Sequence, residues 1–110
     1  FLDISQVTKG HTLVIPKKHS ENIFETDPEI AGKVFEAVPK IANAIKKTYN
    51  PKGLNLLQNN GEFAYQSVFH LHIHLIPRYD ETDGFGLKWE THDGEYNLQQ
   101  VAEEIAKNVD

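Results

Sequence analysis

The amino-acid sequence is notable first for what it lacks. The 110-residue chain contains no cysteine, so it can form no disulfide and offers no thiol nucleophile or thiolate ligand for zinc. Arg78 is its only arginine, which excludes a phosphate site built from several arginines. No apolar run approaches the roughly 20 residues of a membrane-spanning helix. There is also no methionine, and we expect the natural protein to begin before Phe1.

The composition is typical of one folded domain. A chain of 110 residues has room for a single domain, here 1–110, and 39% hydrophobic with 25% charged residues is usual for globular proteins. The net charge of -5 argues against a nucleic-acid binder or a protein of anionic membranes, because both classes need an excess of Lys and Arg. We therefore expect neither partner, and a cytoplasmic location.

Sequence periodicity predicts two helices and several strands. The longer helix covers about 27–49, where Asp27 precedes a proline and apolar residues recur every three or four positions. The shorter helix covers about 98–109, and its apolar residues are expected to face inward. The other elements are strands predicted at 1–4, 11–16, 54–59 and 68–77, and a loop at 80–95.

Three of the six histidines alternate within the strand predicted at 68–77. Neighbouring side chains on a strand point to opposite faces, so His70, His72 and His74 are expected in one row on one face. A shift of one residue would reverse both faces, so the pairing register is well specified. The residues between the histidines should form an apolar row under the long helix: Phe69, Leu71, Ile73 and Leu75.

This spacing alone leaves three interpretations of the histidine row open. The simplest is a polar strand surface that faces solvent. Neutral imidazoles two residues apart on a strand can also converge on a zinc ion. In the third interpretation, one histidine attacks phosphate as a nucleophile, and its neighbours orient it and transfer protons.

The residues just before the row favour phosphate as the ligand. Asn59, Gln66 and Ser67 bring amide and hydroxyl donors, which suit phosphate oxygens in a chain without an arginine cluster. A metallohydrolase would also bring carboxylates close to the histidines. The nearest acidic residues, Glu62 and Asp80, lie in the flanking loops.

The segment 70–76, HLHIHLI, resembles the His-x-His-x-His-x-x signature of the histidine triad (HIT) family, in which x is apolar. Residues 66–68 are similar to the family's phosphate-contacting turn, 10–16 to its second histidine-bearing strand, and 1–5 to its nucleoside-binding segment. The likeness covers 1–79 and is greatest to small bacterial members. It implies an α+β, HIT-like fold, in which an antiparallel sheet packs against the long helix and a C-terminal helix is added.

The resemblance also implies a nucleotide hydrolase or transferase that forms a covalent nucleotidyl-histidine and needs no cofactor for catalysis. His72 would attack the α-phosphorus, with its other ring nitrogen bonded to the backbone carbonyl of His70. His74 would contact the phosphate, and His11 would help to hold the triad. The implied nucleotide contacts are Ser67, Gln66 and Asn59 for the phosphate and leaving group, Asp3 for the ribose hydroxyls, and Phe1 and Ile4 for the base.

The implied activity is hydrolysis of purine nucleoside phosphoramidates, and alternatives stay open. Segment 75–78 resembles the dinucleoside polyphosphate hydrolases, whereas 3–5 and 66–67 resemble the phosphoramidases. A nucleotide-binding regulatory protein with slow turnover and a metalloenzyme are the other candidates. Tyr65 stands where the family commonly has glycine, and a side chain there restricts the backbone beside the phosphates.

Two further expectations come from the resemblance. Many relatives bind structural zinc through an upstream Cys-x-x-Cys, a histidine at the position of His19, and the first triad histidine, here His70. We expect His19 and His70 to be zinc ligands if such cysteines precede Phe1.

HIT proteins of this size are usually homodimers with one continuous sheet, in which the loop around Trp89 could reach the partner's site.

Overall fold

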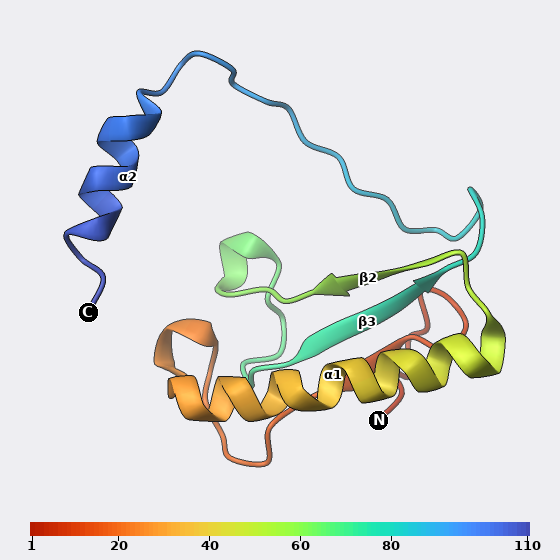
Figure 1. The fold of residues 1–110 in the computed structure, drawn as a ribbon. Helices are drawn as coiled ribbons and strands as arrows, with labels where there is room; N and C mark the ends of the chain where they lie inside the picture. Colours follow the sequence, from red (N-terminus) through yellow and green to blue (C-terminus); the bar gives the residue numbers. More distant parts are fainter.

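A helix and a three-stranded antiparallel sheet form two layers in the computed structural model, which describes residues 1–110 (Figure 1). The central strand β3 (Ile73–Arg78) lies between β1 (Thr12–Val14) and β2 (Gly53–Leu57). The helix α1 (Pro28–Tyr49) covers one face of this sheet. The α+β class and the antiparallel sheet are therefore confirmed. The remaining elements are η1 (Ile23–Glu25), η2 (Glu62–Ala64) and α2 (Leu98–Ala106). Neither α1 nor α2 combines the length and apolarity that crossing a bilayer requires.

Local capping explains why α1 has its predicted boundaries. The Asp27 carboxylate accepts a hydrogen bond of 2.9 Å from the Glu29 N–H, and Pro28 occupies the first helical position, where no N–H donor is needed. At the other end Asn50 is left-handed, with φ 49°, and its N–H donates to the Lys46 carbonyl. Both signals are local, and they fix the helix ends without tertiary contacts.

The core lies between α1 and the sheet. Val14, Ile73 and Leu75 are buried in one cluster together with apolar residues of α1, namely Val34, Val38 and Ile45. In the strand register, His74 lies opposite Leu13 of β1 and Leu57 of β2. Since His74 alternates with Ile73 and Leu75, it faces away from α1. The predicted alternation is confirmed within β3, and it leaves the histidine side of the sheet open.

The prediction of a strand over 68–77 is wrong at its beginning. Residues 68–72 form no strand, and the Leu71 N–H donates to the carbonyl of Ser20 instead of to a neighbouring strand. The last pair between β1 and β3 is Val14 with Ile73, and beyond β1 comes Pro16, which has no N–H to donate. Phe69, predicted to lie under the long helix, is consequently nearly half exposed.

Helix α2 lies apart from the rest of the chain, at the end of an extended arm formed by residues 84–97 (Figure 1). The predicted helix over 98–109 is thus present in shorter form, and the arm contains no helix or strand, as predicted for 80–95. The inward orientation of its apolar residues is wrong for this chain. Leu98, Val101 and Ile105 are 77%, 38% and 62% exposed. Periodicity identifies the face of a helix that is to be buried, but not the surface that buries it.

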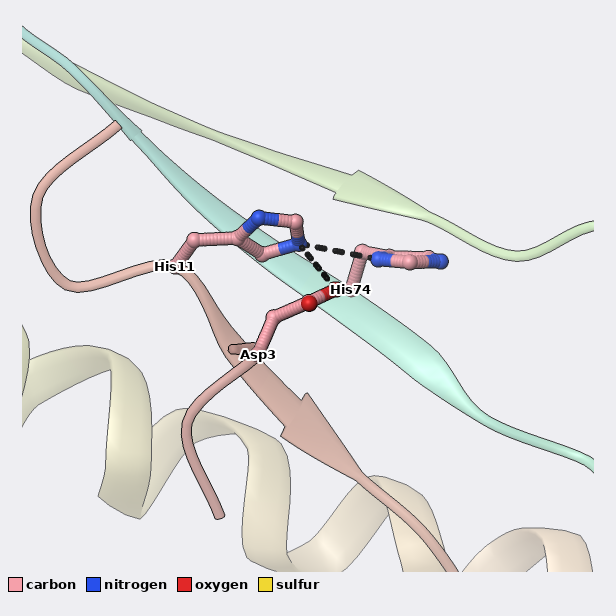
Figure 2. A group of neighbouring side chains, drawn as sticks. All are labelled: Asp3, His11 and His74. Carbon is pink, nitrogen blue, oxygen red and sulfur yellow. Dashed lines mark hydrogen bonds and ion pairs between the residues drawn. The ribbon is translucent and has the colours of Figure 1, made fainter. Parts of the chain in front are cut away.

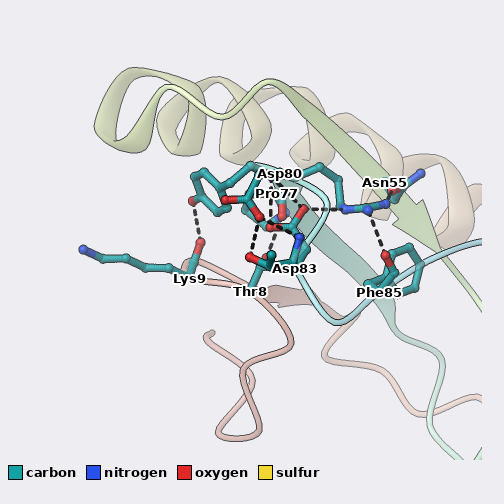
Figure 3. Close-up of polar contacts among 10 residues, drawn as sticks. Thr8, Lys9, Asn55, Pro77, Asp80, Asp83 and Phe85 are labelled. Carbon is teal, nitrogen blue, oxygen red and sulfur yellow. Dashed lines mark hydrogen bonds and ion pairs between the residues drawn. The ribbon is translucent and has the colours of Figure 1, made fainter.

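Polar contacts that join Asn55, Asp83 and Phe85 to Arg78, the last residue of β3, hold the chain where it leaves this strand. The Asn55, Asp83 and Phe85 partners are labelled in Figure 3. Arg78 Nε donates to Asp83 Oδ2 at 3.0 Å and Nη1 donates to Asn55 Oδ1 at 2.9 Å. Nη2 donates to the Phe85 carbonyl at 2.8 Å. The only arginine therefore uses all three of its guanidinium nitrogens to join the base of the arm to β2.

The Asp83 carboxylate accepts hydrogen bonds from both Arg78 and Tyr79. We call this group of polar contacts the Arg78–Asp83 cluster. Burial would raise the pKa of the Asp83 carboxyl, but hydrogen bonds from the Tyr79 N–H, the Arg78 guanidinium and the Asp80 N–H together hold that pKa below its usual range. The Tyr79 hydroxyl in turn donates to the Lys9 carbonyl at 2.6 Å. The cluster thus connects the arm to the N-terminal segment as well as to β2.

Candidate active site

A cavity of about 490 Å³ opens on the face of the sheet opposite α1. The N-terminal segment, β1, the segment after β2 and the histidine row supply its walls. Most of the residues predicted to bind or attack a nucleotide line it: Phe1, Asp3, Asn59, Ser67, His70, His72 and His74. Residues from both ends of the HIT-like region therefore meet in one hollow.

The tautomer of the neutral His72 ring follows from one hydrogen bond. Its Nδ1 lies 2.7 Å from the backbone carbonyl oxygen of His70. A carbonyl oxygen can only accept, so Nδ1 carries the proton and Nε2 keeps its lone pair in the neutral ring. His72 is half-buried in the cavity wall, and its Nε2 has no hydrogen-bond partner within the chain.

Hydrogen bonds through His11 fix the tautomer of His74 (Figure 2). The Val7 N–H donates to His11 Nδ1 at 3.3 Å, so the proton of the neutral His11 ring is on Nε2. That atom lies 2.9 Å from His74 Nδ1 and donates to it. His74 therefore holds its own proton on Nε2, where it can be donated to a ligand. Asp3 Oδ2 lies 3.6 Å from His11 Nε2 and adds a negative charge beside the pair.

Burial is the main reason why the pKa of His74 lies below its ordinary value of 6.5. Positive charge on His72 or His11 would lower this pKa further, whereas the Asp3 carboxylate raises it. The result is a neutral His74 at pH 7. Once His74 is protonated, its Nδ1 becomes a donor that faces the Nε2–H donor of His11, and the chain of hydrogen bonds breaks.

This arrangement predicts a loss of stability and activity in mild acid. Because the folded-state pKa of His74 is below that of the unfolded chain, its full contribution to stability is present above about pH 6.5. That contribution is lost as the pH falls through the folded-state pKa. Imidazole NMR titration should give His74 a midpoint below 6.5, and Tm should decline over the same interval. A midpoint at or above 6.5 would contradict the arrangement.

Asp3, His11 and His74 also bring three candidate metal-ligand atoms within 4.8 Å of one another. The nitrogens of His11 and His74 that face each other already share one proton at 2.9 Å, so a metal would have to displace it. Nor do the three triad histidines form one ligand set, since the two ring nitrogens of His70 face the Pro16 carbonyl and His19 instead. The geometry favours a hydrogen-bond relay over a catalytic metal centre.

The side chain of His70 forms its hydrogen bonds away from the relay. Its Nε2 donates to the Pro16 carbonyl at 2.9 Å, and its Nδ1 lies 3.1 Å from Nδ1 of His19. His70 therefore acts on His72 through its backbone carbonyl. Sequence alternation missed this orientation, because it depends on residues more than 50 positions away.

Gln66 supports the loop before the histidine row and is not part of the cavity wall. Its side chain is buried and makes three bonds to backbone groups: Oε1 accepts from Gly61 N–H at 2.8 Å, and Nε2 donates to the carbonyls of Glu21 and Val68 at 2.7 and 3.1 Å. The side-chain amide therefore has no free donor for phosphate. Ser67, next in the chain, is exposed and lines the cavity.

Ile4, which was predicted to contact the base, is fully exposed and does not line the cavity. Leu13 and Ile15 line it instead, together with Phe1 and Ser5. Sequence reasoning missed Leu13 and Ile15, although their alternation with His11 in the predicted strand over 11–16 placed all three on one face.

The HIT domain family matches residues 1–81 of this chain. The chain belongs to the HIT family. It is 59% identical over 112 residues to Protein hit of Bacillus subtilis, covering 99% of this chain and 77% of that protein. It is 37% identical over 110 residues to adenosine 5'-monophosphoramidase hnt1 of Schizosaccharomyces pombe, covering 99% of this chain and 80% of that protein.

Solved structures agree with the fold of this HIT chain. A HIT family protein from Bacillus anthracis is 63% identical, with a TM-score of 0.97, and the match covers 100% of this chain and 80% of that one. The arm and α2 are therefore included in the likeness. A zinc-bound histidine triad family protein from Mycobacterium smegmatis is 32% identical, with a TM-score of 0.69 over 96% of this chain and 78% of that one.

Proposed function

We propose that this HIT protein hydrolyses adenosine-type nucleotide conjugates at the α-phosphorus, through a covalent intermediate on His72. The observation that carries the proposal is the bond from His72 Nδ1 to the His70 carbonyl, since it leaves Nε2 unprotonated in the wall of the cavity. Membership of the HIT family and the likeness to an adenosine 5'-monophosphoramidase support the same chemistry.

The cavity offers suitable groups for each part of a nucleotide. Phe1, Leu13 and Ile15 provide an apolar end for the base. Asp3 Oδ1 accepts the Ser5 N–H at 2.8 Å, which steadies the carboxylate as an acceptor for the ribose hydroxyls. Donors for the phosphate come from the other end of the cavity: Asn59, Ser67 and the Nε2–H of His74.

The reaction proceeds in two displacements on phosphorus. His72 Nε2 forms a bond to phosphorus as the bond from phosphorus to the leaving amine breaks, and the amine departs with the electron pair and takes up a proton. Water then attacks phosphorus, the Nε2–phosphorus bond breaks, and its electron pair returns to His72. The water supplies a hydroxyl to the nucleotide and releases the proton that balances the one on the amine. The Nε2–H of His74 stabilises the phosphoryl charge in both steps.

Charge around the cavity favours an amine leaving group over a polyphosphate. No Lys or Arg lines the cavity, and the depression beside it contains Glu62. Arg78 is already engaged in the Arg78–Asp83 cluster. A polyphosphate leaving group would therefore meet an acidic side chain without a cationic partner.

Rapid quenching followed by intact-protein mass spectrometry tests this proposal. An adenosine phosphoramidate should give a nucleotidyl adduct that peptide mapping assigns to His72, and its kcat/KM should exceed that for a diadenosine polyphosphate. Turnover without an adduct on His72 would contradict the mechanism. A higher kcat/KM for the polyphosphate would instead favour the polyphosphate hydrolase.

Two unpartnered surfaces support a homodimer as the working form. β2 lies at the edge of the sheet, carries no charged residue, and leaves Leu56 exposed. The apolar stripe of α2 is also exposed, and a nine-residue helix has little stability in water without packing. A second copy of the chain would cover both surfaces, and the arm would carry α2 across to it.

His19 and His70 are suited to a structural zinc ion. Their Nδ1 atoms are 3.1 Å apart, and zinc–nitrogen bonds of about 2.0–2.1 Å place two ligands of a tetrahedral ion about 3.3 Å apart. His70 Nδ1 is free of a proton because Nε2 donates to Pro16. Zinc there would join the segment after β1 to the carbonyl that orients His72, and residues outside 1–110 or water would complete its coordination.

Metal analysis of the full-length protein tests the zinc proposal. We expect stoichiometric zinc that is lost in His19→Ala, and a lower Tm after chelation. Turnover per folded molecule should remain, because zinc takes no part in the displacement. A full-length protein without zinc would contradict the site, and chelation that abolishes turnover without unfolding would favour the metalloenzyme.

A further inference from the structure

Tyr65 has a backbone conformation that favours glycine. Its φ is 71° and its ψ is 18°, in the left-handed region, directly after η2. The turn requires this conformation, because the Tyr65 N–H donates to the Glu62 carbonyl at 3.0 Å and the following Gln66 N–H donates to Gly61 at 3.0 Å. A bulky L-residue is disfavoured here because its Cβ crowds the backbone, whereas glycine has no Cβ.

No contact of the Tyr65 side chain within the chain offsets this unfavourable backbone conformation. The residue is 87% exposed, its hydroxyl has no hydrogen-bond partner, and its ring has no aromatic partner within the chain. Strained residues of this kind persist mainly where a binding or catalytic site uses them. A ligand bound beside Tyr65 would supply the contacts that the chain itself does not give the ring.

Tyr65 belongs to the walls of two hollows. It lines the active-site cavity, and with Ser67 it also lines a more open depression of about 480 Å³. Phe69 and Glu62 supply the rest of the accessible wall of that depression, since the Gln66 side chain is buried below it. A group attached to a phosphate beside Ser67 can extend into this depression along the ring of Tyr65.

We propose that Tyr65 is a specificity-determining residue that binds the leaving group and selects conjugates whose leaving amine carries an aromatic ring. The proposal rests on the function proposed above and names its substrate class. Tyr65 and Phe69 offer ring faces and edges to an aromatic group. The Glu62 carboxylate suits the ammonium ion that forms when the amine departs, and it opposes anionic leaving groups.

Two adenosine phosphoramidates of nearly equal size provide the test, one made with 2-phenylethylamine and one with 2-cyclohexylethylamine. The wild type and Tyr65→Phe should prefer the aromatic conjugate in kcat/KM by about threefold to tenfold, the range expected of one aromatic contact. Tyr65→Leu and Tyr65→Gly should reduce this ratio to about one. Tyr65→Gly should also have a Tm at least as high as the wild type, because the backbone strain is removed.

Phe63→Leu is the matched control, because Phe63 is a fully exposed aromatic residue two positions away that lines neither hollow. Its ratio should equal that of the wild type. An aromatic preference that survives in Tyr65→Leu and Tyr65→Gly, or that is absent from the wild type, overturns the role of Tyr65.

Failure of the proposed function has a different signature, namely no nucleotidyl adduct on His72 with either conjugate. The Tyr65 proposal is then decided by binding alone. Dissociation constants of the two conjugates are measured in His72→Ala, with and without Tyr65→Leu. An aromatic preference that Tyr65→Leu removes supports the role of Tyr65, and an unchanged ratio overturns it.

Discussion

Replacing His72 with alanine should lower kcat/KM for an adenosine phosphoramidate by at least about 10³-fold, the usual scale of loss when a covalent nucleophile is removed. The variant has no nitrogen to form the intermediate. The groups expected to bind AMP remain in place, because Asp3, Ser67 and His74 do not depend on the His72 side chain for their hydrogen bonds. Steady-state kinetics and calorimetric titration with AMP measure the two properties separately.

His92→Ala is the matched control for this substitution. His92 is an exposed histidine of the arm that pairs with Glu95 at 3.2 Å and takes no part in the cavity. Its removal should leave turnover and AMP binding unchanged. A His72→Ala protein with more than a tenth of wild-type activity would contradict the nucleophile. A wild type that binds AMP but turns over no faster than His72→Ala would indicate a nucleotide-binding regulatory protein.

The double substitution Val101→Asp with Ile105→Asp should raise the dissociation constant of the proposed dimer by at least about 100-fold, since truncating or charging a few buried anchors removes much of an interface's binding energy. Both residues belong to the exposed apolar stripe of α2, and the two carboxylates would have to be desolvated when α2 packs on the partner. Sedimentation equilibrium over a range of protein concentrations gives the dissociation constant.

The control adds the same charge to the opposite side of α2, by Gln99→Asp with Gln100→Asp. Both glutamines are exposed and bond only within the helix, to Glu103 and Glu104. This variant should remain dimeric. A wild type that is monomeric at micromolar concentration, or a Val101 and Ile105 variant that associates as tightly as the control, would contradict the proposed dimer.

Capping residues and the alternation of apolar residues predicted those parts of the fold that depend on interactions between residues near in sequence. The boundaries of α1 follow from Asp27 and Pro28 at one end and Asn50 at the other, all of which act within one helical turn. The alternation of His74 with Ile73 and Leu75 followed from burial on one face. Residues 68–72 were mistaken for strand because their pattern is suitable, whereas pairing also depends on how far β1 extends.

The sequence predicted which residues form the histidine site better than it predicted how their side chains are oriented. His72 and His74 line the cavity as alternation required, but the ring of His70 turns to His19, a contact across 51 positions of sequence. For the left-handed backbone of Tyr65 the one sign was the glycine that the family commonly has at this position, because a tyrosine itself gives none. The burial of Gln66 depends on Glu21, which lies in a different part of the chain.

The Arg78–Asp83 cluster has an entropic consequence for association. It fastens the base of the arm to β2 and the N-terminal segment, and the Thr8 hydroxyl reinforces this by donating to the Pro77 carbonyl at 2.6 Å. A segment whose starting point and direction are already fixed has less conformational freedom to lose when its far end docks. Loosening the cluster would therefore weaken the proposed dimer from a distance, by widening the volume that α2 must search before it meets a second copy.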